Sequence, residues 1–179
     1  MIVWINGAFG AGKTTLAEEL LRTLPDAMPF DPEYIGCDLR EWVPAPESGD
    51  FQDIPAWRKL TAEFAITLTA EYNRPLIVPM TVVDPDYRRE IFGLIGKAGE
   101  RVLHVFLDVP ADELRRRIDA QVLIADDPDR DAKARAFRHR NVERCVAARA
   151  DLPADTLVLR SDQHTPGELA ALVIQAMAA

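Results

Sequence analysis

Residues 7–15 read GAFGAGKTT and directly follow the apolar run Met1-Ile2-Val3-Trp4-Ile5. They match the phosphate-loop pattern G-x-x-x-x-G-K-[ST], with a strand-like run before it and a helical pattern after it, which is the context this pattern requires. Glycines let the backbone N–H groups turn toward a phosphate, and the N-terminus of the following helix adds partial positive charge. The stretch therefore predicts a site for a nucleoside triphosphate.

The loop positions have separate expected roles. The Lys13 ammonium is expected to reach the β- and γ-phosphates, and the Thr14 hydroxyl is expected to ligate Mg²⁺. ATP is favoured over GTP because the sequence contains no N-K-x-D element for reading guanine. The alternative for the loop is a glycine-rich turn that binds nothing. The residues expected to bind the nucleotide are Gly7, Ala8, Gly10, Ala11, Gly12, Lys13, Thr14 and Thr15.

Length and composition restrict the class of protein. The 179 residues, 48% hydrophobic and 28% charged, suit one globular domain over residues 1–179, either as a monomer or as a homodimer. The net charge of −8 argues against nucleic-acid binding. No charged leader precedes the first strand and no apolar stretch approaches the ~20 residues of a membrane span, so we expect a cytoplasmic protein without stable membrane insertion. Cys37 and Cys145 lack metal-ligand spacing and are expected to be reduced thiols.

Short strands alternate with amphipathic helices along the whole chain, which predicts a parallel sheet with helices on both faces. Residues 126–135 are charged and weakly patterned, so we expect a mobile excursion there instead of a core element. Thr165 and Glu168 form a capping-box pattern at the start of the last helix. The expected strands are residues 2–5, 27–30, 75–83, 101–109 and 156–159, and the expected helices are residues 14–24, 34–42, 57–72, 84–97, 110–118, a segment ending near 150, and 165–179.

Four blocks in order from Met1 to about Tyr87, namely WINGAFGAGKT, FDPEYIG, FQDIPAWR and LIVPMTVVDPDY, resemble the tunicamycin-resistance ATP-binding proteins, which belong to the small P-loop kinase-like group. The resemblance implies a nucleoside- or shikimate-kinase-like α/β fold, a three-layer sandwich whose five-stranded parallel sheet has the order 2-3-1-4-5. It also implies an acceptor-binding segment over about residues 34–73, a mobile lid over about residues 119–140, and a role in resistance to a nucleoside antibiotic.

Asp31 is the carboxylate expected to work beside the phosphate loop. It ends the second expected strand, at the sheet edge where open α/β folds bind ligands. In the kinases that this sequence resembles, an acid at this place accepts the proton of the acceptor hydroxyl or holds Mg²⁺ through water. The alternative is an Asx turn before Pro32, and Glu33 is the second candidate. The strand at residues 76–81 ends without an acid, which weakens a hydrolytic role, and Asp84 can be a helix cap instead.

Arginine is expected to close the site because its planar fork pairs bidentately with phosphate oxygens. Arg117 falls where the resembling kinases place an arginine near the adenine and the phosphates. The alternative for the later arginines is a solvated surface paired with the aspartates of residues 126–131. Those arginines are Arg130, Arg135, Arg138, Arg140 and Arg144.

The acceptor pocket is expected between the second and third strands, where aromatic and cationic residues mix. This combination suits a sugar or nucleoside that carries an anionic group. Trp57 can equally be a core residue, and Arg58 a surface residue. The residues of this segment are Arg40, Trp42, Phe51, Trp57 and Arg58, and the expected substrate-binding set is Asp31, Arg40, Trp57 and Arg58.

These observations predict a single-domain enzyme that uses Mg·ATP to phosphorylate a hydroxyl of a small molecule. The expected catalytic residues are Lys13, Asp31 and Arg117, and the expected metal ligands are Thr14 and Asp31. The alternative is an ATP-binding protein that sequesters an antibiotic without modifying it. A plain ATPase is the third possibility.

Overall fold

A computed structural model describes residues 1–179, and its centre is one parallel sheet of five strands. The strands lie in the order β2-β3-β1-β4-β5, so the expected order 2-3-1-4-5 is confirmed. β1 is the middle strand and pairs in parallel with β3 on one side and β4 on the other. The strands are β1 (Ile2–Gly7), β2 (Met28–Pro29), β3 (Leu76–Pro79), β4 (Val102–Asp108) and β5 (Leu157–Arg160).

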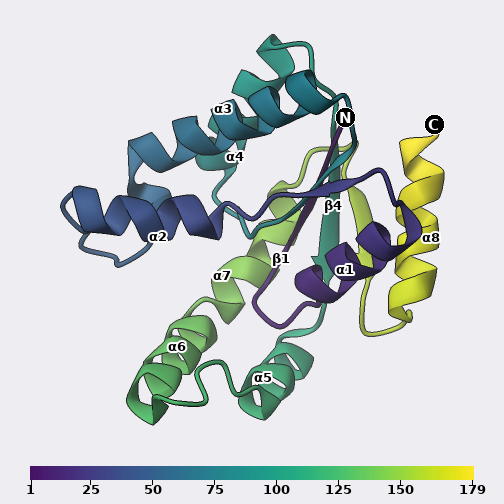
Figure 1. The fold of residues 1–179 in the computed structure, drawn as a ribbon. Helices are drawn as coiled ribbons and strands as arrows, with labels where there is room; N and C mark the ends of the chain where they lie inside the picture. The colour runs from purple at the N-terminus through teal and green to yellow at the C-terminus, as the bar shows by residue number, and fades with distance from the viewer.

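Helices cover both faces of the sheet, as Figure 1 shows, with α1 and α8 on one face and α3 and α4 on the other. The pair α5 and α6 lies beyond the carboxyl ends of the strands, together with the loop that follows β1 (Figure 1). The helices are α1 (Lys13–Thr23), α2 (Glu33–Trp42), α3 (Pro55–Tyr72), α4 (Pro85–Lys97), α5 (Ala111–Ala120), α6 (Pro128–Arg140), α7 (Val142–Ala147) and α8 (Pro166–Met177), with short 3-10 helices at Phe51–Asp53 and Ala148–Asp151.

The side chains of β1 alternate between two separate apolar cores. Val3 and Ile5 belong to the core beneath α1 and α8, whereas Ile2 and Trp4 belong to the core beneath α3 and α4. All four are fully buried. A strand that is apolar at every position and buried on both faces is typical of the centre of a parallel sheet. The double burial holds the end of β1, and with it the phosphate loop, in place.

Two expectations about secondary structure are wrong in detail. β3 ends at Pro79, short of the expected Val83, because the chain then turns across β1 and bonds to side chains instead of a strand. There the Trp4 indole N–H donates to the Met80 carbonyl at 3.0 Å, and the Asn6 amide donates to the Val82 carbonyl at 2.7 Å. The Met80 N–H still donates to the Ile5 carbonyl of β1 at 3.0 Å, and beyond it the Asn6 side chain bonds to the backbone of Val82 in place of strand pairing.

The charged segment expected as a mobile excursion is instead part of helix α6. Asp127 caps this helix by accepting from the Arg130 N–H at 3.0 Å, and Pro128 occupies its first position. The Asp131 carboxylate accepts from the Leu123 N–H at 2.6 Å and pairs with Arg135 at 2.5 Å. Caps and ion pairs stabilise α6 in place of an apolar stripe, so its helical period is weak in the sequence.

Other local expectations agree with the structure. Asp84 caps α4 by accepting from the backbone N–H groups of Asp86 and Tyr87. Thr165 and Glu168 form the complete capping box at α8. None of the helices combines the length and the apolar character that a membrane crossing requires.

Candidate functional site

The loop between β1 and α1 is closed by two glycines that no other residue could replace without strain. A Cβ atom on Gly7 would lie 2.8 Å from the Leu107 carbonyl oxygen on neighbouring β4. Gly12 has a φ of 94° at the N-cap of α1, a conformation that side chains with a Cβ rarely adopt. The loop therefore wraps over the start of α1, as a phosphate-binding loop must.

Lys13 folds back over the loop. Its Nζ donates to the carbonyl oxygens of Gly7 at 3.1 Å and Ala8 at 2.9 Å, and it lies 5.5 Å from the ring centroid of Phe9. Burial of the ammonium lowers the pKa of Lys13 to about 8. A half-buried cation that makes no ion pair is suited to receive an anion such as a nucleotide phosphate.

A small cavity of about 180 Å³ lies directly against Lys13. Backbone and side chains of the loop form one wall, and carboxylate, amide and guanidinium groups form the other. Its lining residues are Phe9, Gly10, Gly12, Lys13, Thr14, Thr15, Asp31, Glu33, Pro79, Gln121 and Arg138. Three expected functional residues thus meet at one cavity: Lys13 and Thr14 from the start of α1, and Asp31 from the segment after β2.

Asp31 lies just after β2, where its side chain forms the turn before Pro32 and also lines the cavity beside Lys13. Its Oδ1 accepts from the Glu33 N–H at 2.9 Å, so the Asx turn is present. The residue also lines the cavity beside Lys13. The turn orients one carboxylate oxygen, while Oδ2 makes no hydrogen bond within the protein. Loss of solvent around its carboxyl group and then the charge of Asp31 raise the pKa of Glu33.

Arg138 is the arginine of α6 that reaches the 180 Å³ cavity beside Lys13, which is called the phosphate cavity from here on. Its Nη1 donates to the Gln121 side-chain oxygen at 2.8 Å, and its guanidinium carbon lies 5.6 Å from the Phe9 ring centroid. Arg130 and Arg135 pair with Asp127 and Asp131 on the helix itself, as the surface alternative expected.

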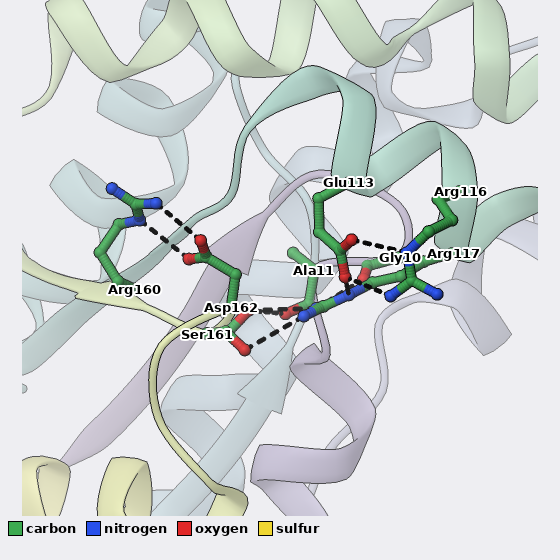
Figure 2. A network of polar contacts seen from close by, with 8 residues as sticks. All are labelled: Gly10, Ala11, Glu113, Arg116, Arg117, Arg160, Ser161 and Asp162. Atoms are coloured by element: carbon green, nitrogen blue, oxygen red, sulfur yellow. Dashed lines mark hydrogen bonds and ion pairs between the residues drawn. The ribbon is translucent and has the colours of Figure 1, made fainter.

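Arg117 holds the phosphate loop from outside, as Figure 2 shows. Its Nη1 donates to the Gly10 carbonyl at 3.3 Å, and its Nη2 donates to the Ser161 carbonyl at 3.2 Å. The Ser161 hydroxyl donates to the Ala11 carbonyl at 2.6 Å, so the loop, α5 and the segment after β5 are joined. Glu113 pairs with Arg117 at 2.6 Å and with Arg116 at 2.7 Å, and these two hydrogen bonds lower the pKa of Glu113 to about 2.

A second cavity of about 210 Å³ lies beside this network and shares Gly12 and Thr15 with the phosphate cavity. A guanidinium plane on one side suits a flat aromatic ring such as a nucleobase. Its lining residues are Ala11, Gly12, Thr15, Leu16, Arg117, Ser161, His164, Pro166 and Leu169. Arg117 therefore lies between this second cavity and the phosphate loop.

A third and larger cavity, of about 590 Å³, adjoins the phosphate cavity on the side of β2 and β3. The two cavities share Thr14, Asp31 and Pro79. The larger one is lined by Thr14, Ala17, Glu18, Leu21, Pro29, Phe30, Asp31, Tyr34, Ile35, Asp38, Phe64, Ile77 and Pro79. Asp31 thus separates a phosphate-sized space from a space that can hold a small molecule.

Two residues expected in the acceptor pocket, Trp57 and Arg58, lie elsewhere. Trp57 is fully buried in the core beneath α3, and its indole N–H donates to the Pro32 carbonyl at 2.9 Å. Arg58 is 8% exposed, pairs with Glu90 at 2.5 Å and stacks 4.2 Å from the Tyr87 ring centroid. A guanidinium that is already paired and covered supports the segment and does not line the 590 Å³ cavity.

Arg40 is exposed on α2 and lies 5.2 Å from the ring centroid of Phe51. Its Nη2 donates to the Gly49 carbonyl at 2.9 Å. Its charge is a minor influence that lowers the pKa of Glu33, so it faces the site only at a distance. His104 is buried in β4 between Asn6 and Thr156, as a structural histidine.

Sequence reasoning missed several lining residues. Ser161 follows the carboxyl end of β5, and the rule that ligands gather at this sheet edge could have identified it. Tyr34, Asp38 and Phe64 come from two helices, and nothing in the local pattern distinguishes them from surface residues. Phe64 fits the apolar spacing of α3 but is 49% exposed.

The oxygen donors around the phosphate cavity fit Mg²⁺. Thr14 supplies a hydroxyl, and Asp31 and Glu33 supply carboxylates to the same cavity. No group of three or more His, Cys, Asp or Glu side chains forms a metal cage. Mg²⁺ beside a nucleotide is held by one or two protein oxygens and the phosphates, so this donor set is sufficient.

Comparison with known proteins agrees with this geometry. A family model described as an AAA domain matches residues 2–144. No curated protein matches the chain.

Three solved structures share the fold. The tunicamycin resistance protein of Deinococcus radiodurans has a TM-score of 0.76 and 24% identity, covering 99% of this chain and 95% of that one. The APS kinase of Mycobacterium tuberculosis, in complex with AMPPNP and APS, has a TM-score of 0.68 and 20% identity, with 99% and 97% covered. The shikimate kinase of Bacteroides thetaiotaomicron has a TM-score of 0.62 and 17% identity, with 100% and 99% covered. Similarity at such identity is similarity of fold, and it confirms the expected kinase-like architecture.

Proposed function

Because this chain belongs to the AAA domain family, whose phosphate loop it carries in full, we propose that it is an ATP-dependent phosphotransferase. Its acceptor is the hydroxyl group of a small molecule. The observation that carries this proposal is the pair of cavities of about 180 and 590 Å³ that share Thr14, Asp31 and Pro79. A transferase needs an acceptor space beside the γ-phosphate, whereas a plain ATPase needs only a water molecule there.

The reaction assigns a role to each residue at the junction. The acceptor oxygen attacks the γ-phosphorus, the bond from that phosphorus to the β–γ bridging oxygen breaks, and ADP leaves. Asp31 accepts the proton of the acceptor hydroxyl. Lys13 and Arg138 neutralise the charge on the transferred phosphoryl group, and Arg117 stacks against the base and keeps the loop in place.

Thr14 and Asp31 would hold Mg²⁺, which when bound with ATP offsets the charge of the β- and γ-phosphates. The segment of residues 119–140 is proposed as the lid, because Gln121 and Arg138 bring its two ends to the phosphate cavity. Closure over the cavity would exclude water, which favours transfer to an acceptor over hydrolysis.

The tunicamycin resistance protein with the same fold makes tunicamycin the first acceptor to test. The protein is incubated with Mg·ATP and a panel of tunicamycin, nucleosides and other small alcohols, and the mass of each compound is then measured by mass spectrometry. We expect one class to gain the mass of one phosphoryl group. Unchanged mass with ATP-dependent retention would instead identify a sequestering protein, and ATP loss that no acceptor alters would identify an ATPase.

The matched variants are Asp31→Asn and Asp26→Asn. Asp26 lies in the exposed turn before β2, outside the cavities, and its variant is expected to retain activity. Loss of the Asp31 carboxylate should lower kcat by a factor of about 10² to 10⁴. Full activity of Asp31→Asn would remove the proposed role of this residue.

A further inference from the structure

The charged side chains that line the 590 Å³ cavity all carry the same sign. They are Glu18 on α1, Asp31 after β2 and Asp38 on α2, and no Lys or Arg lines the cavity. Glu18 and Asp38 make no ion pair within the protein, so no cation of the chain neutralises them. The cavity is lined by residues of α1, α2 and α3 and of the ends of β2 and β3.

Aromatic rings form the other notable part of the wall. Phe30 and Phe64 stack with ring centroids 6.3 Å apart and an interplanar angle of 7°. Phe64 is 49% exposed and Tyr34 is 75% exposed, although both are large aromatic residues. An ammonium group is attracted to carboxylates and to the faces of aromatic rings alike.

The apolar surface continues past Phe64. A neighbouring cavity of about 260 Å³ shares this residue, and it is lined by Leu60, Glu63, Phe64, Thr67 and Leu68. Its charged residue is again acidic. The combined surface offers space for an apolar body and repels an anion at each charged position.

We propose that the acceptor is an amino alcohol, with a positively charged amine and an apolar body attached to the hydroxyl-bearing carbon chain. The hydroxyl lies at Asp31, the amine lies between Asp38, Glu18 and the ring of Tyr34, and the apolar body packs on Phe30 and Phe64. This inference rests on the proposed phosphotransferase function. It reverses the expectation of an anionic acceptor, because neither of the two arginines expected there, Arg40 and Arg58, lines the cavity, and Arg58 is paired with Glu90.

Three alcohols with the same phenyl-substituted three-carbon skeleton test the proposal, because they differ in charge. They are phenylalaninol, which carries an ammonium, 3-phenylpropanol, which is neutral, and 3-phenyllactate, which carries a carboxylate. The hydroxyl is on the first carbon in the first two and on the second carbon in the third. Titration into the protein with Mg·AMPPNP is followed by the amide NMR signals of Tyr34, Ile35 and Asp38. We expect phenylalaninol to bind at least about tenfold more tightly than phenyllactate, with phenylpropanol between them.

Charge reversal gives the matched control. Asp38→Lys should invert the order of affinity of the three ligands. Glu41→Lys makes the same change in charge at an exposed residue of α2 outside the cavity, and it should preserve that order. Equal effects of the two variants would mean a general surface-charge effect and would overturn the proposal. So would tighter binding of phenyllactate to the unaltered protein, or no shift of these amides with any of the three.

The amide signals of Gly12 and Thr15 report nucleotide binding in the same titration. If AMPPNP shifts them but the alcohols show no preference for positive charge, only the acceptor class is wrong. If AMPPNP fails to shift them, the phosphotransferase proposal itself fails.

Discussion

Arg117 and Ser161 are bonded to each other and to consecutive residues of the phosphate loop. Arg117 Nη1 lies 3.3 Å from the Gly10 carbonyl oxygen, and Ser161 Oγ lies 2.6 Å from that of Ala11 (Figure 2). The loop is therefore held from the side of the 210 Å³ cavity before any nucleotide arrives. Preorganised loops bind more tightly because less ordering remains to be done on binding.

Replacing Arg117 by Ala should weaken binding of AMPPNP about tenfold, since the loop loses its support and the base loses a stacking partner. Arg116→Ala is the matched control, because Arg116 also pairs with Glu113 but makes no bond to the loop. We expect that variant to bind within about twofold of the unaltered protein by isothermal titration calorimetry. Equal losses would show that the effect passes through Glu113.

Nucleotide affinity should depend on pH through Lys13. Burial lowers its pKa to about 8 in the free protein, and bound phosphates favour the charged form and raise that pKa. Above pH 8, Lys13 must take up a proton when the nucleotide binds, so the affinity for the nucleotide falls by up to about tenfold per pH unit. Below pH 7, Lys13 is already protonated and the affinity does not change with pH through this residue. Lys13→Arg, which stays charged, should remove the fall between pH 8 and 9.5. A level titration of the unaltered protein over that range would contradict the low pKa.

Replacing either of two helical glycines by alanine should change the free energy of unfolding, and the two changes should have opposite signs. A Cβ on Gly36 in α2 would lie 2.5 Å from Cγ of Phe51, so Gly36→Ala should lower the free energy of unfolding by about 1–3 kcal/mol despite the better helix propensity of Ala. A Cβ on Gly93 in α4 meets nothing within 4 Å, so Gly93→Ala should raise it by about 0.5–1 kcal/mol. Urea unfolding measures both. Stabilisation by both variants would mean that Phe51 moves aside freely.

Removing the guanidinium of Arg58 should lower the stability of the fold and leave the affinity for the nucleotide unchanged. Arg58→Ala leaves Glu90 without its partner and exposes the Tyr87 ring, which should lower the free energy of unfolding by about 2–4 kcal/mol. Lys59→Ala, at the exposed neighbouring position of α3, should change it by less than about 0.5 kcal/mol. Arg58→Ala with unchanged stability but weaker acceptor binding would restore the role in the acceptor pocket expected from the sequence.

Local patterns predicted the elements that position the site. The apolar run before the loop, the Asp84 cap and the capping box at Thr165 each depend on residues within one strand or one helical turn, and the structure confirms all three. The dependence on local patterns also explains why the prediction of an excursion at α6 is wrong. Part of the stabilisation of this helix comes from the Leu123 and Ile124 N–H groups, which precede the helix and donate to the Asp131 carboxylate. The apolar period of the helix carries no sign of these bonds.

The positions of the loop, of Asp31 and of Arg117 were predictable from the sequence, because strand–loop–helix motifs and sheet edges place such residues in a standard way. The partners were not readable. Arg58 pairs with a glutamate 32 residues away, Arg117 bonds to a serine 44 residues away, and Arg138 among several arginines reaches the phosphate cavity. Nothing near these arginines in the sequence identifies their partners, and tertiary packing decides which contact each makes. For this reason the phosphate loop follows from the order of the amino acids. The cavity of about 590 Å³, where Asp38 and Phe64 are brought together from two helices, exists only once the helices have packed.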